Sequence, residues 1–334
     1  MKMLLKIKFL LFAVGIFALL NASILKSDEY VMFIPSIAYD IDNETTGVEV
    51  KAYVYEKERR LGATTALSYY LGINRLNAVE KQRLYDKSAL FRIDYESDKE
   101  FFVTFKNKNI YKMPKTIDGK SYATIKMEKP ANMEREIAFE VYNSKYPKNT
   151  EKGFALYSSN DGISAIFDID DTIKNSNVLD KKALLINTFL NEYTAVESIQ
   201  EIFKHVQNLR ADTYHYVSAS PTQLYPALKS FFEKENIPKG TFHLRDMTDL
   251  SDFIPNQEIT VRHKKETIEK LFKVFPKRKF ILVGDSGEND PEIYAYLSRK
   301  YPDKVLLIII RNITDEDKES LRFKEIDKSK FILF

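Results

Sequence analysis

The chain has 334 residues, of which 44% are apolar, so it is long enough for two domains of about 100–200 residues and apolar enough to build a core in each. Its 51 basic and 48 acidic residues nearly cancel, which leaves no concentrated positive charge for binding nucleic acid. The chain has no cysteine, which excludes disulfides, thiol catalysis and cysteine-bound zinc.

A basic stretch and an apolar run over residues 9–20 mark the N-terminus. The run is shorter than the roughly 20 residues that a membrane-spanning helix needs, and with its basic flank it is typical of a secretory signal. We predict a signal peptide over residues 1–22 and an exported protein, periplasmic or envelope-associated. Cleavage after Ala22 would place Leu20 where a small residue is preferred. An uncleaved N-terminal anchor is therefore the alternative.

Residues 28–150 are predicted to form a β-rich N-terminal domain. Alternation of apolar with polar or aromatic residues predicts strands at 48–55, 101–105, 121–127 and 137–142. A helix is predicted at 66–85. Short strands at such intervals are typical of a sandwich or a barrel. We find no catalytic constellation in this part of the sequence.

A polar stretch at 143–152 separates this part from a predicted second domain over 153–334, in which strands and helices alternate. That alternation predicts an α/β fold with a parallel sheet. Strands are predicted at 163–167, 213–217, 242–244, 280–283 and 305–310. Helices are predicted at 182–190, 196–207, 224–233, 266–275 and 292–297.

Two carboxylates, Asp168 and Asp170, follow the first strand of this second domain directly. Residues two apart on an extended chain project to the same side. Two acidic groups held that close repel each other unless a cation lies between them. A hard divalent cation such as Mg²⁺ prefers oxygen ligands. The pair therefore indicates a metal-assisted phosphoryl-transfer site.

Further polar residues stand where predicted strands end or helices begin. Ser218 ends the second strand, Asp285 and Asp290 follow the fourth, and Lys264 and Lys265 are predicted to open a helix. Ligands of open α/β sheets bind outside the carboxyl ends of the strands, so we expect these residues to share one site. A single Asp or Ser at a strand end is more often a helix cap. It is the ordered set that favours a shared phosphate site.

In this order the residues resemble the four motifs of the haloacid-dehalogenase-like (HAD-like) superfamily. Over about 153–314 the sequence resembles the catalytic domain of the actin-patch-associated phosphatidate phosphatases and their bacterial relatives. The resemblance lies in the segments DIDDTIK, VSASPTQLYP, FPKRKFILVGDSGENDPEIY and LLIIIRNIT. It implies a HAD-like Rossmannoid parallel sheet with a minimal cap, preceded here by the β-rich, sandwich-like N-terminal domain.

The resemblance also implies catalytic roles for the first two carboxylates. Asp168 would attack phosphorus and form an aspartyl-phosphate, which splits one hard step into two. Asp170 would protonate the leaving alkoxide and then activate water. An acid at this position favours hydrolysis of the intermediate over its storage, because ion pumps of the superfamily carry Thr there.

The metal and phosphate contacts are likewise implied by the resemblance. Mg²⁺ would be held by the Asp168 carboxylate, the Asp170 carbonyl and the Asp285 carboxylate, with Asp290 acting through water or by orienting Lys264. Ser218 would donate to a phosphoryl oxygen, and Lys264 would neutralise the charge of the phosphoryl group. The spacing to the apolar residues that follow favours Lys264 over Lys265.

Neighbouring polar residues receive structural interpretations. Asp171 is expected to brace the loop after the first strand, and Ser220 to be a turn residue, with a phosphate contact as the alternative. For Arg245 we expect a salt bridge, with a substrate contact as the alternative. His215, in a predicted buried strand, and His263, beside the lysines, are not expected to bind metal.

The spacing of the motifs bears on the substrate. Asp168 to Ser218 spans 50 positions and Ser218 to Lys264 spans 46, which leaves little chain for a lid. An open site admits bulky substrates, and we expect a phosphorylated substrate, such as phosphatidate at a membrane surface. Soluble protein, sugar or nucleotide phosphates are the alternative. A non-catalytic envelope-binding module is the alternative of another class. The sequence identifies no protein partner.

Overall fold

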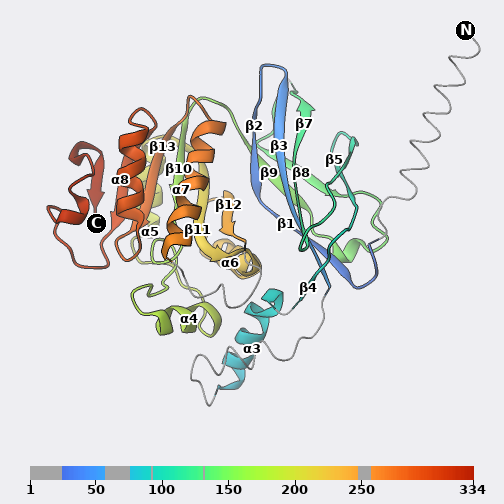
Figure 1. Ribbon diagram of the computed structural model, residues 1–334, viewed down its shortest axis with the longest axis horizontal. Coiled ribbons are helices and arrows are strands. Elements are labelled where there is room, and N and C mark those ends of the chain that lie inside the picture. Colours follow the sequence, from blue (N-terminus) through green and yellow to red (C-terminus); the bar gives the residue numbers. More distant parts are fainter. Residues whose placement is uncertain (1–24, 57–75, 92, 131, 247–256) are drawn as a thin grey trace, which may run out of the picture.

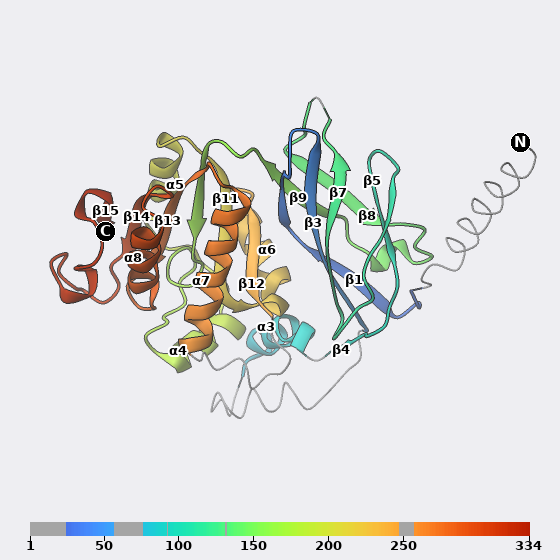
Figure 2. The same cartoon turned by 45° about the horizontal axis from the view of Figure 1, so that its top comes forward.

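The computed structural model describes residues 25–56, 76–91, 93–130, 132–246 and 257–334. They form two β-sheets, and most helices gather around the C-terminal sheet (Figures 1 and 2). Within these ranges, no helix combines the length and the apolar character needed to cross a membrane. The predicted signal peptide at 1–22 lies outside the described residues.

The N-terminal sheet is mixed and curls around its own core. Its strand order is β1-β3-β2-β9-β8-β5-β6, with β4 and β7 also paired to β3. The two ends of the sheet approach each other, because Ser121 of β7 donates to the carbonyl of Pro114, just beyond β6, at 2.6 Å. The strands are β1 (Glu29–Ile34), β2 (Ser36–Asp40), β3 (Thr45–Glu56), β4 (Asp94–Tyr95), β5 (Phe102–Phe105), β6 (Ile110–Lys112), β7 (Lys120–Glu128), β8 (Glu136–Val141) and β9 (Gly153–Ser158).

The four strands predicted in this part coincide with β3, β5, β7 and β8. Strand β9 follows the predicted domain boundary in sequence, yet it pairs with β2 and β8 of the N-terminal sheet. The predicted helix at 66–85 overlaps α3 (Ala78–Lys87), which Asn77 caps through its side chain. The rest of that prediction, at 66–75, lies outside the described residues.

The C-terminal sheet is parallel throughout and doubly wound. Its order is β12-β11-β10-β13-β14-β15, which is 3-2-1-4-5-6 when the strands are counted along the chain. In such sheets the ligand crevice lies where the order reverses, at the carboxyl ends of strands 1 and 4. Here those are β10 and β13. The strands are β10 (Ile163–Phe167), β11 (Ala211–Pro221), β12 (Thr241–Arg245), β13 (Lys279–Asp285), β14 (Val305–Arg311) and β15 (Phe331–Leu333).

Helices cover both faces of this sheet. Side chains of β10 alternate between two buried clusters, Ala165 and Phe167 facing one and Ile166 the other. The first cluster includes residues of α4, α5 and α6, and the second includes residues of α7 and α8. The helices are α4 (Lys181–Phe189), α5 (Ile199–Asn208), α6 (Tyr225–Lys234), α7 (Gln257–Val274) and α8 (Asp290–Lys300).

The prediction that Lys264 and Lys265 open a helix is wrong. Helix α7 already contains residues from Gln257 onward, so both lysines lie in its interior. The residues from 257 to 263 contain neither Gly nor Pro to stop a helix. The buried stripe of α7 also begins earlier than its apolar residues suggest, because Thr260 and Lys264 belong to it.

The two sheets share buried structure. Phe167 of β10 lies in the same buried cluster as Met32, Ile34 and Tyr53 of the N-terminal sheet. The amide of Phe242 in β12 donates to the carbonyl of Pro35 at 3.0 Å. The N-terminal sheet therefore completes the core beneath the edge of the C-terminal sheet.

Arg278 fastens the connection from β9 to β10. It is only 1% exposed. Its guanidinium donates to the carbonyls of Ser159 at 3.0 Å, Asp161 at 2.6 Å and Ile163 at 3.0 Å, and it pairs with the carboxylate of Asp212. One buried fork of donors thus holds the whole connecting segment.

Candidate active site

Asp168 and Asp285 lie side by side at the switch point of the C-terminal sheet. Their strands pair in parallel, with Phe167 opposite Val283. Asp168 is 1% exposed and Asp285 is 0% exposed. Both carboxylate oxygens of Asp168 and the Oδ2 atom of Asp285 are buried and accept no well-formed hydrogen bond, although Asp168 Oδ1 forms an ion pair with Lys264. Because burying carboxylates with too few donors is costly, this arrangement calls for compensating positive charge.

The ammonium of Lys264 enters this site from α7. Its Nζ atom lies 2.9 Å from Asp168 Oδ1, 2.8 Å from Glu288 Oε2 and 2.6 Å from Asp290 Oδ1. Three carboxylates therefore contact one ammonium. The nearby carboxylate of Asp285 adds a fourth negative charge to the site. Burial raises the pKa of Asp168 well above its usual range, and Lys264 only partly opposes this. The pKa of Asp285 is raised by burial and by the charge of Asp290.

The surplus negative charge fits a divalent cation. One carboxylate oxygen each from Asp168, Asp285 and Glu288 lie within 4.8 Å of one another. Three hard oxygen donors around so small a volume suit Mg²⁺. Of the four predicted metal residues, the structure brings Asp168 and Asp285 into this group. Glu288 is a third member that the sequence analysis missed.

The other two predicted metal residues are engaged differently. Asp290 directs one oxygen to Lys264 and the other toward the amide of Asp285, at 3.4 Å, as expected for a residue that orients the lysine. The Asp170 carboxylate is held by donors of its own. Ligation through the Asp170 carbonyl stays a prediction.

The loop between β13 and α8 folds Glu288 back onto the site. The Oδ1 atom of Asp285 accepts from the amides of Gly287 at 2.7 Å and Glu288 at 3.1 Å. A Cβ atom on Gly287 would lie 2.4 Å from the Ile313 side chain and 2.7 Å from that of Val178, so a larger residue here would have to displace both side chains. The sequence signal for Glu288 was its place three residues after Asp285 in a glycine turn.

Four donors hold the carboxylate of Asp170. Burial favours its neutral form, but the Lys174 ammonium and hydrogen bonds from Lys174, Ser176 and Ser220 outweigh burial and lower the pKa of Asp170 to about 2. The donors are Lys174 Nζ at 2.8 Å, Ser176 Oγ at 2.7 Å, Ser220 Oγ at 2.6 Å and Ser218 Oγ at 3.3 Å. Asp170 is therefore ionised and fixed in place.

Lys174 reaches Asp170 because the chain turns sharply after the first strand. The amide of Lys174 donates to the carbonyl of Ile169 at 2.9 Å, and the side chain is 2% exposed. Asp171 has a positive φ of 54°, and its carboxylate accepts from three successive amides of residues 176–178. The predicted bracing role of Asp171 is confirmed. Lys174 was missed because a lysine near a strand end carries no signal alone.

The end of β11 supplies the hydroxyls of the site. Ser218 is 1% exposed, and its Oγ atom also accepts from the amide of Ser220 at 2.9 Å. Ser220, predicted to be a turn residue, hydrogen-bonds Asp170 instead. Arg245 donates from Nε to the carbonyl of Ala219 at 3.1 Å. These contacts tie the ends of β11 and β12 to the loop of Asp170.

An opening beside Asp170 leads to the surface. Its lining combines polar groups with apolar side chains from the segment that runs into α4, and α4 forms one wall. The residues that characterise it are Asp170, Ser218, Arg245, Val178, Leu184 and Pro221. Leu179, the residue after Val178 in the chain, is 57% exposed.

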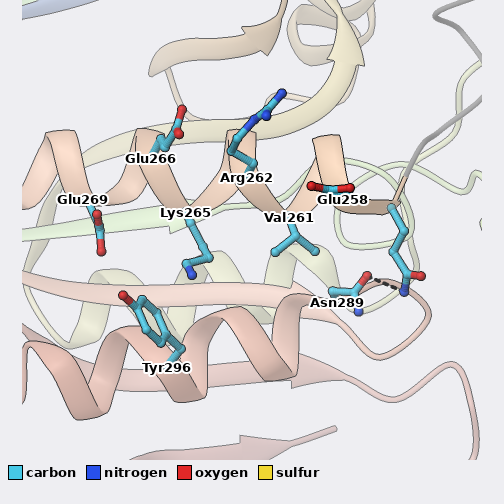
Figure 3. A pocket seen from close by; sticks show the side chains of 9 residues that line it. Glu258, Val261, Arg262, Lys265, Glu266, Glu269, Asn289 and Tyr296 are labelled. Carbon is cyan, nitrogen blue, oxygen red and sulfur yellow. Dashed lines mark hydrogen bonds between the residues drawn. The ribbon is translucent and has the colours of Figure 1, made fainter.

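Lys265 points away from the carboxylates. It lies in a groove between α7 and α8, where its ammonium is 3.8 Å from the centre of the Tyr296 ring (Figure 3). Charged side chains of both signs, such as Arg262 and Glu266, line the same groove. Of the two candidate lysines, Lys264 is the one placed at the site.

His215 is buried and His263 is half-buried, and neither belongs to the carboxylate group. His215 Nδ1 is 2.8 Å from the hydroxyl of Thr241, and His263 Nε2 is 3.2 Å from the carbonyl of His243. Burial lowers the pKa of His215 to about 3, and the charge of Arg278 adds to this. These rings are neutral packing groups at neutral pH.

Sequence comparison assigns relatives to the half of the chain that carries this site. Residues 163–312 match the family model described as phosphatidate phosphatase APP1, catalytic domain. An uncharacterized protein of Schizosaccharomyces pombe is 35% identical over 160 residues, which is 46% of this chain and 26% of that protein. Phosphatidate phosphatase APP1 of Saccharomyces cerevisiae is 34% identical over 160 residues, 47% of this chain and 27% of its own length.

The resemblance predicted from the motifs is confirmed for this segment. The matched residues include every site residue named above from Asp168 to Asp290. The chain spans about a quarter of the length of the curated relatives that it matches. The N-terminal sheet and its contacts with the site lie outside the match.

Proposed function

We propose, on the basis of a C-terminal half homologous to a phosphatidate phosphatase, that this protein hydrolyses phosphomonoesters on a HAD-like fold, with Mg²⁺ as its cofactor. The observation that carries the proposal is the contrast between two carboxylates two positions apart. Asp168 is buried with an ion pair to the shared Lys264 ammonium and no well-formed hydrogen bond, whereas Asp170 is fixed by four donors. Such pairs separate a nucleophile from an acid–base group.

In the first step an oxygen of Asp168 attacks phosphorus, and the bond between phosphorus and the leaving alkoxide breaks. The alkoxide takes its proton from Asp170. Asp170 is ionised before substrate binds, and the negative charge of an incoming phosphate favours its uptake of that proton. Ser218 and Lys264 are placed to bind phosphoryl oxygens.

In the second step water attacks the aspartyl-phosphate, and Asp170, again ionised, accepts the proton of the water. Phosphate leaves, and Asp168 is regenerated as a carboxylate. Mg²⁺ held by Asp168, Asp285 and Glu288 would offset the repulsion between nucleophile and phosphate. Asp290 keeps the Lys264 ammonium directed at Asp168 throughout.

Phosphatidate, or a similar lipid phosphomonoester, is the proposed substrate. The activity for which the yeast relative is named supports this choice, as do the apolar side chains at the opening beside Asp170. The test compares phosphate release from phosphatidate vesicles with release from nucleotide and sugar phosphates, with Mg²⁺ and with excess chelator. Much faster turnover of the soluble esters would favour the alternative of a soluble-substrate phosphatase.

The Asp168→Asn variant tests the chemistry. It should fold and lose turnover, because an amide does not form the acyl phosphate. Asp303→Asn is a control, since this exposed carboxylate lies between α8 and β14, away from the site. Unchanged turnover in Asp168→Asn would contradict the mechanism. Absence of turnover on every ester would favour the non-catalytic envelope-binding module.

Export to the periplasm or envelope is proposed from the N-terminal sequence alone. The expected result is a mature protein that begins at Ser23 and is released by disruption of the outer cell layers. Recovery of the intact N-terminus in the membrane fraction would favour the uncleaved anchor.

A further inference from the structure

Two tyrosine hydroxyls of the N-terminal sheet contact the half of the chain that carries the site. Tyr53 of β3 and Tyr122 of β7 face each other with ring centroids 5.8 Å apart. Both hydroxyls contact one carboxylate, that of Asp246, which follows β12. The Tyr122 hydroxyl lies 3.0 Å from Oδ1 and 3.1 Å from Oδ2 of Asp246. Tyr53 is 4% exposed, so its hydroxyl is committed to this contact.

From Asp246 the contacts continue to the turn that follows β11. Thr222 Oγ1 lies 3.4 Å from Asp246 Oδ1 and 3.3 Å from the carbonyl of Arg245. The Tyr53 hydroxyl also lies 3.4 Å from Thr222 Oγ1. Arg245 in turn donates to the carbonyl of Ala219. The tyrosines therefore contact two residues next to the end of β11 (Ser218–Pro221): Thr222, which follows it in the chain, and Asp246, which follows the neighbouring strand β12.

The last step reaches the catalytic carboxylate. Ser220 and Ser218, the hydroxyls on either side of Ala219, both contact Asp170 Oδ2, at 2.6 Å and 3.3 Å. Displacement of a catalytic group by about 1 Å costs about a hundredfold in reaction rate. The chain of contacts from Tyr53 and Tyr122 to Asp170 is thus short, polar and built on two different sheets.

We propose that Tyr53 and Tyr122 are positioning residues for the active site, and that the N-terminal sheet holds the end of β11, Ser218–Pro221, in its catalytic geometry through Asp246. The inference rests on the proposed phosphatase function for its kinetic consequence, but its structural consequence is independent of it. It gives the N-terminal sheet a role that the sequence analysis did not find.

The test uses the full chain with Tyr53→Phe, Tyr122→Phe and both together. Asp246 is exposed, so water can replace one lost hydroxyl, and the double variant carries the decision. Tyr157→Phe is a matched control, because it also removes a hydroxyl from a carboxylate, that of Asp40, at 2.9 Å and 3.0 Å. That pair joins two strands of the N-terminal sheet and has no part in the contacts described above.

We expect the double variant to lose about tenfold or more in kcat on p-nitrophenyl phosphate, as is usual when a supporting partner is removed, with KM changed by less than about twofold. Amide hydrogen exchange over residues 218–224 should be faster than in the control. If the double variant does not fold, Tyr53→Phe alone should show the same two effects in smaller measure, because Tyr53 is 4% exposed and its hydroxyl also contacts Thr222, so water replaces it less readily than the hydroxyl of Tyr122.

Two results for the double variant would overturn the inference. One is amide exchange over residues 218–224 that is no faster than in Tyr157→Phe. The other is a kcat equal to that of Tyr157→Phe, measured on the sample used for the exchange experiment. Failure of the proposed function is separable. If Asp168→Asn keeps the turnover of the unmodified protein, the phosphatase proposal fails. The exchange measurement still decides whether the tyrosines position the end of β11.

Discussion

Replacing Glu288 by Gln should change stability in opposite directions with and without Mg²⁺. Burial raises the pKa of Glu288, with Lys264 opposing. A raised carboxyl pKa means that the folded state is favoured by protonation, so its ionised form at neutral pH reduces the free energy of unfolding. Without metal, Glu288→Gln removes one of the three carboxylates that contact the Lys264 ammonium, and we expect a protein as stable or more stable.

Mg²⁺ should stabilise the Glu288→Gln variant less than it stabilises the unmodified protein. A ligand that binds only the folded state stabilises it by RT ln(1 + [L]/Kd). Loss of one of three carboxylate donors that lie within 4.8 Å of one another should weaken binding by about tenfold to a hundredfold, by analogy with lost metal-site partners. At saturating Mg²⁺ that is about 1.4 to 2.7 kcal/mol of lost stabilisation, since each tenfold change is worth about 1.4 kcal/mol.

The assay is urea unfolding of the unmodified protein, Glu288→Gln and Glu266→Gln, each in chelator and in excess Mg²⁺. Glu266 lies on the outer face of α7, in the groove with Lys265, and serves as the control that should behave like the unmodified protein. An equal gain from Mg²⁺ in Glu288→Gln and in the control would refute the assignment of Glu288 to the metal site.

Three further expectations follow from the buried charges. Lys174→Met removes the ammonium that lowers the pKa of Asp170 to about 2, so that pKa should rise and the acid limb of the pH–kcat profile should move to higher pH. Arg278→Met leaves the carbonyls of the β9–β10 connection without donors and should cost about 3 kcal/mol or more in urea unfolding. Arg278→Lys should restore little of this, because an ammonium lacks the guanidinium fork. His215 has a pKa lowered to about 3, so its stabilising neutral form is fully present above its unfolded value near 6.5 and is lost as the pH falls from there toward 3. Through this residue the protein should lose roughly 2 kcal/mol of its free energy of unfolding by pH 5. The measurement is the difference in acid sensitivity between the unmodified protein and His215→Phe.

Residues at the ends of strands were the predictable part of the site. Asp168, Ser218 and Asp285 follow apolar runs that the parallel sheet brings to one edge, so local sequence and a general rule of α/β topology were sufficient. Lys264 was placed correctly at the site but wrongly at a helix start. Its buried position among Thr260 and the apolar residues of α7 is set by the carboxylates opposite, which helix periodicity does not report.

The unpredicted part depends on contacts distant in the chain. Strand β9 joins the N-terminal sheet by pairing Ser36 with Ala155, a contact across more than a hundred residues that no local pattern reveals. Tyr53 and Tyr122 were interpreted only as part of a β-rich core, because their partner Asp246 belongs to the other sheet. Lys174 and Glu288 are ordinary polar residues in sequence, and only the turns that fold them back give them a function.

The two carboxylates proposed as nucleophile and acid–base group differ in what each needs to become active. Asp170 already has its donors, so its orientation does not depend on a bound ion. Asp168 is short of positive charge, because Lys264 is shared among several acids, and its raised pKa favours the protonated, non-nucleophilic form. A cation in the group formed with Asp285 and Glu288 would favour ionisation of Asp168, since an opposite charge lowers a carboxyl pKa. Under the proposed mechanism, the acid–base group would therefore be ready without the metal, whereas the nucleophile would depend on it.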